Sequence, residues 1–109
     1  MAERIPDEAI VVRGGRNSPA DLRRGTSMHP SGVTGVSVEC AAGTSVDELA
    51  AALPHNQIGV TTAGTIRAAG GDVVRTAGRS RHHATLVGLS PEKASRLLTP
   101  TRPNPGHKP

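Results

Sequence analysis

The chain of 109 residues contains no Phe, Tyr or Trp. Without aromatic rings it lacks the side chains that bury the largest areas, so we expect a core built from Val, Leu, Ile and Ala. The same absence argues against RNA-binding platforms that stack bases on aromatic rings, as RRM and OB folds do. It also weakens any hypothesis in which a nicotinamide or adenine ring lies between aromatic side chains.

Cysteines and long apolar runs are also scarce. The single cysteine, Cys40, excludes an internal disulfide and a thiolate-based zinc site. The spacing of the five histidines matches no metal pattern, so we expect neither a metal nor a cofactor. No apolar run approaches the roughly 18 residues that span a membrane, and the N-terminal MAERIPDEA lacks the apolar stretch of a signal peptide. We therefore expect a cytoplasmic protein without a membrane partner.

Positive charge is unevenly distributed along the chain. Residues 1–61 contain five basic and seven acidic side chains, whereas residues 62–109 contain eight basic and two acidic ones. Eleven of the thirteen basic residues are Arg, which stays charged and binds phosphate through a planar fork. A cationic C-terminal half indicates a polyanionic partner such as RNA. A GC-rich coding sequence would also enrich Arg, but it would not explain the asymmetry.

Apolar alternation and capping residues predict an α+β fold. We expect strands at 9–13, 35–39, 57–61, 72–76 and 83–88, helices at 18–25, 45–53 and 90–98, helical turns at 65–69, and a loop at 26–34. This order predicts a small antiparallel or mixed sheet of about five strands, with short helices packed on one side. Residues 1–98 would form the single domain. The Pro-rich residues 99–109 would form an extended tail without core residues, either free or laid against a partner.

The segment RTAGRSRHHATLVGLSP places two histidines at the start of a strand. Neighbouring side chains of a strand point to opposite faces, so only one of His82 and His83 can face a given cleft, and Thr85 lies on the face of His83. Arg79 and Arg81 come just before them. Imidazole and fixed cations together are what cleavage of RNA by its own 2′-hydroxyl requires. The alternative is a polar strand entrance with solvated imidazoles.

Further candidate residues lie at strand ends. Arg13 precedes two glycines, which would let backbone approach a ligand closely. Ser37, Thr61 and Thr62 can hold a phosphate or ribose by hydrogen bonds, although Thr also simply suits strands. His55 follows Pro54 and is interpreted as a loop residue, with a catalytic role left open.

The chain resembles a group of small bacterial proteins that share VVRGG, GVSV, HNQ-x-GVTT, R-x-x-GG and HHATL-x-GL-x-P. In size, charge and layout it also resembles compact RNase toxins of the barnase, colicin-tRNase and RelE type. That resemblance implies an antiparallel sheet with Arg, Lys and a late-strand His on one face. The departure is the lack of a clear Glu base paired with the histidine, unless Glu39 or Glu48 comes near it in space.

The leading hypothesis is a metal-independent endoribonuclease that acts as a bacterial toxin. His83 would be the general acid or base, and Arg13 and Arg81 would stabilise the phosphorane charge. Three further arginines would guide the RNA backbone: Arg67, Arg75 and Arg79. The substrate would be RNA, with tRNA one candidate, and an acidic antitoxin or immunity protein would be the partner.

Two alternatives remain open. The chain also resembles ADP-ribosyltransferase toxins, which begin with a strand-borne Arg like Arg13 and carry a serine strand like GVSV. This resemblance implies that Arg13 and Ser37 would bind NAD, although the aromatic residue and the late catalytic Glu of that class are missing. The second alternative is a non-enzymatic module that binds an acidic partner.

Overall fold

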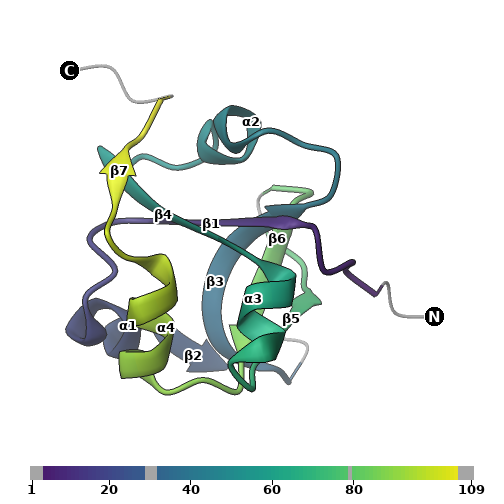
Figure 1. Cartoon of the computed structure of the whole chain (residues 1–109), viewed down its shortest axis with the longest axis vertical. Helices are drawn as coiled ribbons and strands as arrows, with labels where there is room; N and C mark the ends of the chain where they lie inside the picture. The colour runs from purple at the N-terminus through teal and green to yellow at the C-terminus, as the bar shows by residue number, and fades with distance from the viewer. Residues whose placement is uncertain (1–3, 29–31, 79, 106–109) are drawn as a thin grey trace.

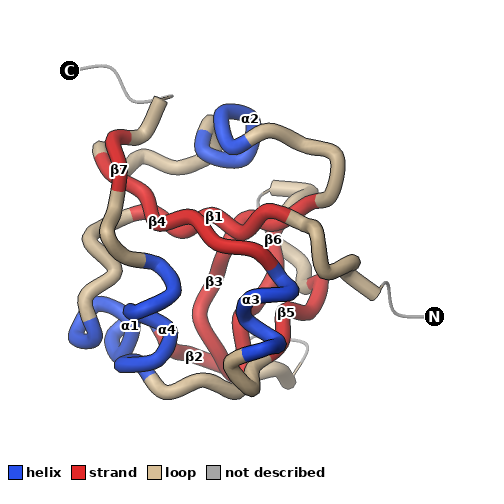
Figure 2. Tube along the Cα trace, in the orientation of Figure 1, coloured by secondary structure: helices blue, strands red, loops and turns tan. Residues whose placement is uncertain are grey.

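Within the described residues, seven strands form one antiparallel sheet (Figures 1 and 2). The structure is a computed structural model that describes residues 4–28, 32–78 and 80–105. The strands are β1 (Ile10–Gly14), β2 (Thr26–Met28), β3 (Thr34–Ala41), β4 (Gln57–Thr62), β5 (Asp72–Arg75), β6 (His83–Val87) and β7 (Arg102–Pro103). The strand order is β5-β6-β3-β1-β4-β7, and β2 pairs with β3. The predicted α+β class and antiparallel sheet are confirmed, with two strands more than expected.

The described part of the chain contains the helices α1 (Pro19–Gly25), α2 (Val46–Ala50), α3 (Ala63–Ala68) and α4 (Pro91–Leu98), and a serine caps the start of α1, α2 and α4. Ser18, Ser45 and Ser90 each accept a hydrogen bond from the backbone N–H three residues later. Thr62 caps α3 in the same way, so α3 begins two residues earlier than predicted. The capping prediction is confirmed for α1, α2 and α4.

The helices lie on both faces of the sheet. Val11 and its neighbours on one face pack with Leu22 of α1, Ile66 of α3 and Leu98 of α4. Val12, on the opposite face, packs with Leu49 of α2, and Figure 1 shows α2 apart from the other three helices. The expectation that the helices pack on one side is therefore wrong. Because the apolar run of β1 points to both faces, each face needs its own cover.

The segment predicted as a C-terminal tail joins the sheet. Its strand β7 pairs with the edge of β4, with Ile58 opposite Arg102. Asn104 is 4% exposed, and its Nδ2 donates to the carbonyl oxygens of Leu53 (3.2 Å) and His55 (2.8 Å). Residues 102–104 are therefore part of the domain rather than a separate tail, although the described residues of this segment add no side chain to the apolar core. Residues 106–109 lie outside the described part of the chain.

The strand β2 was predicted as loop. It pairs with the start of β3, with Thr26 opposite Val36, and all three of its residues are exposed. A strand this short, without a buried side chain, leaves no alternation in the sequence.

In the residues that the structure describes, no helix is long and apolar enough to cross a membrane.

Candidate functional site

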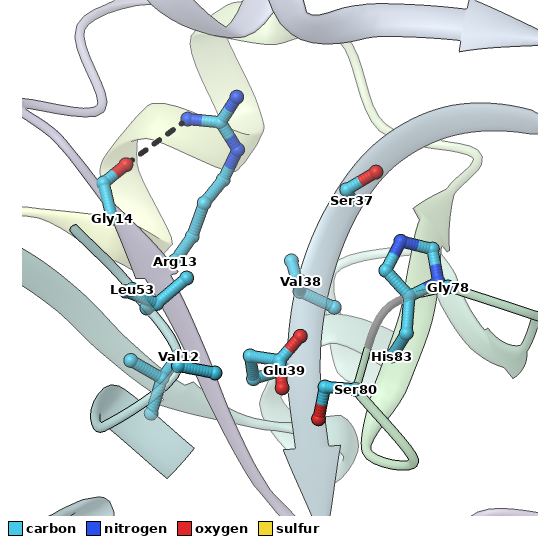
Figure 3. Close-up of a pocket in the computed structure, with 11 residues that line it drawn as sticks. Val12, Arg13, Gly14, Ser37, Val38, Glu39, Leu53, Gly78, Ser80 and His83 are labelled. Atoms are coloured by element: carbon cyan, nitrogen blue, oxygen red, sulfur yellow. Dashed lines mark hydrogen bonds between the residues drawn. The ribbon is translucent and has the colours of Figure 1, made fainter. Parts of the chain in front are cut away.

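The strands β1 and β3 separate after a short paired stretch. They pair from Ile10 opposite Ala41 to Val12 opposite Glu39. Beyond that point β1 stays paired with β4, up to Gly14, while β3 continues with β2 and β6. A cavity of about 480 Å³ lies where the two strands part (Figure 3). Its polar lining side chains are Arg13, Ser37, Glu39, Ser80 and His83.

Glu39 and His83 form a cross-strand pair at this cavity. Glu39 of β3 lies directly opposite His83 of β6, so both side chains are on the same face of the sheet. Directly opposite Cβ atoms in an antiparallel pair are about 4.5–5.5 Å apart. Glu39 is only 6% exposed, and its Oε1 has no hydrogen-bond partner among the described residues. A buried carboxylate oxygen without a partner is unfavourable for stability, which is typical of a functional site.

The hydroxyl groups of Thr76 and Thr85 form a chain of contacts that ends at His83. The Nδ1 of His83 lies 2.9 Å from the hydroxyl of Thr76 and 3.2 Å from its carbonyl oxygen. The Thr76 hydroxyl in turn lies 2.8 Å from that of Thr85, which is fully buried. Because a carbonyl oxygen only accepts, this contact favours the tautomer in which Nδ1 carries the proton and Nε2 is the nitrogen that exchanges protons. The His83 ring also packs against Gly78, where a Cβ would lie 2.3 Å from Cγ of His83.

Arg13 is held in place by Asn17. Its Nη1 donates to the Asn17 side-chain oxygen at 2.9 Å and contacts the Gly14 carbonyl oxygen at 3.5 Å, the dashed line in Figure 3. Asn17 is fully buried, and its backbone has a positive φ of 56°. Its Nδ2 donates to the carbonyl oxygens of Arg13 and Gly15. Burial lowers the pKa of Arg13 and nearby Asp21 partly restores it, but a guanidinium stays cationic at neutral pH.

A second cavity of about 420 Å³ adjoins the first. The two cavities share the lining residues Arg13, Gly14, Ser37 and Leu53. His55 and Arg24 line only the second cavity. His55 lies on the backbone of Gly14, where a Cβ would be 2.2 Å from Nδ1. Gly14, the first of the two glycines after Arg13, thus does permit a close approach, although the group that approaches is a side chain of the protein itself.

Three of the predicted site residues line the first cavity: His83, Arg13 and Ser37. Thr85 is not among the lining residues, and the hydroxyl of Thr76 links it to His83. Of the two histidines, His83 at the start of β6 lines this cavity, whereas His82, in the turn before β6, is not among its lining residues. The carbonyl oxygen of His82 instead accepts the Cys40 N–H.

The remaining predicted residues lie elsewhere or have other contacts. Arg67 forms ion pairs with Asp7 and Asp72, at 2.5 and 2.8 Å. Arg75 donates to the carbonyl oxygens of Cys40 and His83. The other positions are Thr61 on β4, Thr62 as the cap of α3, Arg81 exposed in the turn before β6, and Arg79, which lies outside the described residues.

Sequence reasoning undervalued Glu39 and missed Asn17. Glu39 has a visible signal, because it shares strand parity with Ser37 in a stretch whose other face is apolar. Asn17 has none, since its buried position depends on how the loop after β1 folds back over Arg13. His55, left open as a loop residue, lines the second cavity.

No protein-family model, no curated protein and no solved structure matches the chain. Among residues 4–28, 32–78 and 80–105, no group of three or more His, Cys, Asp and Glu side chains is placed to hold a metal ion. The function is therefore inferred from the residues of the two cavities.

Proposed function

We propose that this protein is an endoribonuclease that cleaves RNA by acid–base catalysis in the cavity between β1, β3 and β6, and that it acts as a bacterial toxin. The single observation that carries the proposal is the pairing of Glu39 with His83 in a cavity that also holds Arg13. A Glu base paired with the histidine was the feature of the RNase-toxin resemblance that the sequence did not show, and Glu39 lies where such a base would be.

The two residues have complementary roles in this reaction. The Glu39 carboxylate removes the proton from the ribose 2′-hydroxyl, and the 2′-oxygen then bonds to phosphorus. The bond from phosphorus to the 5′-oxygen breaks as His83 donates a proton from Nε2 to that oxygen. The products are a 2′,3′-cyclic phosphate and a free 5′-hydroxyl. Each positioned acid or base contributes roughly 100- to 10,000-fold to such a step.

Arg13 stabilises the charge that builds up on the phosphorane oxygens. A guanidinium already fixed by Asn17 needs little reorganisation during the reaction, which makes its electrostatic contribution large. The Arg13 side chain lines the cavity, and a guanidinium is well suited to bind a phosphate oxygen.

The test is cleavage of total bacterial RNA by the purified protein in EDTA, with the new ends mapped. We expect discrete cuts with 2′,3′-cyclic phosphate ends. His83→Ala and Glu39→Gln should each reduce the rate by about 100-fold or more. His82→Ala and Glu48→Gln are the matched controls and should cleave like the wild type. If His83→Ala with its fold intact cleaves RNA normally, the assignment is wrong.

ADP-ribosyl transfer is the second candidate. Ser37 and Glu39 of β3 line the same cavity as Arg13, so an arginine, a serine and a carboxylate are available to a molecule such as NAD. The cross-strand histidine favours RNA cleavage over this reaction. Labelled NAD separates the two, because only the transferase would move the label to protein or nucleic acid. A protein inactive in both assays would instead fit a binding module for an acidic partner.

A further inference from the structure

The two cavities are neighbours, since both are lined by Arg13, Gly14, Ser37 and Leu53. Together they are called the groove below. The Glu39–His83 pair lies at one end of the groove, and Arg24 and His55 lie at the other. The reaction described above uses only the first end and Arg13.

We infer that the second cavity is a subsite for the phosphate next to the scissile one, and that the substrate is single-stranded RNA with at least two phosphates. This inference rests on the proposed ribonuclease function. Arg24 of α1 and Arg13 of β1 both line the second cavity, and guanidinium groups are the side chains best suited to phosphate.

One of the two arginines of this subsite is paired with a carboxylate in the absence of RNA. Arg24 is ion-paired with Asp21, three residues earlier on α1, and both line the cavity. The Arg24 side chain is 71% exposed, so it is free to turn from the carboxylate to a phosphate at small cost. Because Asp21 compensates part of the charge, we expect a moderate contribution to binding rather than a dominant one.

His55 is fixed at the subsite, although it lies in a loop. Its ring rests on Gly14, and its carbonyl oxygen accepts a hydrogen bond of 2.8 Å from the buried side chain of Asn104. Its ring nitrogens make no side-chain hydrogen bond to the described residues that would compete with a ligand. An imidazole can donate to a phosphate oxygen or lie against a base, since RNA bases also stack on His.

Burial of the reacting end explains why the substrate is single-stranded. Glu39 is 6% exposed, so the RNA backbone must bend into the groove to reach it. A base-paired A-form helix holds its backbone in a regular geometry and presents its 2′-hydroxyls across a wide minor groove. An unpaired strand can adopt the required bend.

The experiment compares two substrates of the purified protein, a ribodinucleoside monophosphate with one phosphate and a short unpaired oligoribonucleotide with several. We expect a higher kcat/KM for the oligonucleotide. Arg24→Ala should reduce the ratio of the two kcat/KM values by about 3- to 10-fold, as expected for one exposed charge-assisted contact. The salt dependence for the oligonucleotide should also become shallower, by about 0.7 in the log–log slope.

Arg23→Ala is the matched control, because Arg23 is also an exposed arginine of α1 but pairs with Glu92 and is not among the residues lining the groove. It should leave the ratio at the wild-type value. If the wild type cleaves both substrates equally well, or if Arg24→Ala behaves like Arg23→Ala, the second subsite is refuted while the ribonuclease proposal stands. If neither substrate is cleaved, the ribonuclease proposal itself fails.

Discussion

Glu39 and His83 lie directly opposite each other on two antiparallel strands, at the point where the sheet opens into a cavity. The two residues are 44 positions apart in the sequence, and only the pairing of β3 with β6 brings them together. Two side chains on adjacent strands are held at a distance fixed by the backbone ladder. The proposed cleavage reaction needs an acid and a base fixed in this way on the two sides of one phosphate.

The pair should behave as one catalytic unit. Glu39→Gln and His83→Ala should each reduce kcat by about 100-fold or more. The kcat of the double variant should lie within a few-fold of that of the slower single variant. The reason is that neither proton transfer helps much once the other is lost. Single-turnover rates of the two single variants and the double variant check this. Multiplicative losses would mean that the two residues act independently.

Thr76 should act as a positioning residue for His83. Thr76→Val keeps the side-chain volume but removes the hydroxyl that contacts Nδ1 of His83 and the hydroxyl of Thr85. We expect kcat to fall by about 10-fold with KM little changed, and the free energy of unfolding to fall by about 1–3 kcal/mol, because the buried Thr85 hydroxyl loses its partner. Thr76→Ser restores the hydroxyl and should recover kcat. Failure of Ser to do so would remove the hydroxyl chain from the mechanism.

Much of the fold was predictable because its signals are local. A serine cap and the N–H three residues later are encoded within one turn, so the starts of α1 and α4 follow from Ser18 and Ser90. Strand alternation is equally local, and it placed Thr85 on the face of His83. The prediction that only one histidine faces a given cleft needed no tertiary information.

The rest depends on contacts that the sequence does not encode locally. The partner of His83 is set by the register between β3 and β6, and β7 forms only because the edge of β4 is available to it. Arg67 was predicted to guide RNA, but its guanidinium donates from Nη1 to Asp7 and from Nε to Asp72. These two partners are 60 and 5 positions away in the sequence. Composition indicates a cationic half but cannot show which cations are already paired.

Asn17 should be needed for the position of Arg13. Asn17→Gly tolerates the positive φ but loses the hydrogen bonds to Arg13 and to the carbonyl oxygens of Arg13 and Gly15. Asn17→Ala loses the same bonds and adds backbone strain of about 1 kcal/mol or more. We expect both variants to cleave RNA slowly and Ala to unfold more readily than Gly in urea. Full activity of a folded Asn17→Gly would show that the guanidinium is held by other groups.

Asn104 should stabilise the loop that carries His55. Asn104→Ala leaves the carbonyl oxygens of Leu53 and His55 without their donor, which should lower the free energy of unfolding by about 1–3 kcal/mol. The oligonucleotide should also be cleaved more slowly. Arg102→Ala is the control, since its side chain is exposed and its pairing with Ile58 uses the backbone, so it should change stability by less than about 0.5 kcal/mol. Equal urea midpoints for the two variants would refute a structural role of this segment.

The ion pairs of Arg67 should contribute to stability in a pH-dependent way. Burial raises the pKa of Asp72, but hydrogen bonds from Arg67 and from the Val73 N–H outweigh this and leave the pKa below its ordinary value. A lowered carboxyl pKa contributes stability that is fully present above the unfolded pKa of about 3.9 and is lost as the pH falls below it. Because the Asp72 side chain is 49% exposed, the contribution at pH 7 should be modest, about 0.5–1 kcal/mol.

Asp72→Asn therefore should lower the free energy of unfolding at neutral pH, and its difference from the wild type should shrink toward about pH 3. Urea unfolding at several pH values measures this. Glu8→Gln is the control, since Glu8 is exposed and has no ion pair among the described residues. RNA cleavage at neutral pH should be unchanged in Asp72→Asn, because the Arg67 cluster lines neither cavity of the groove. A loss of cleavage without a loss of stability would instead return Arg67 and its partners to the RNA-binding surface that its charge first indicated.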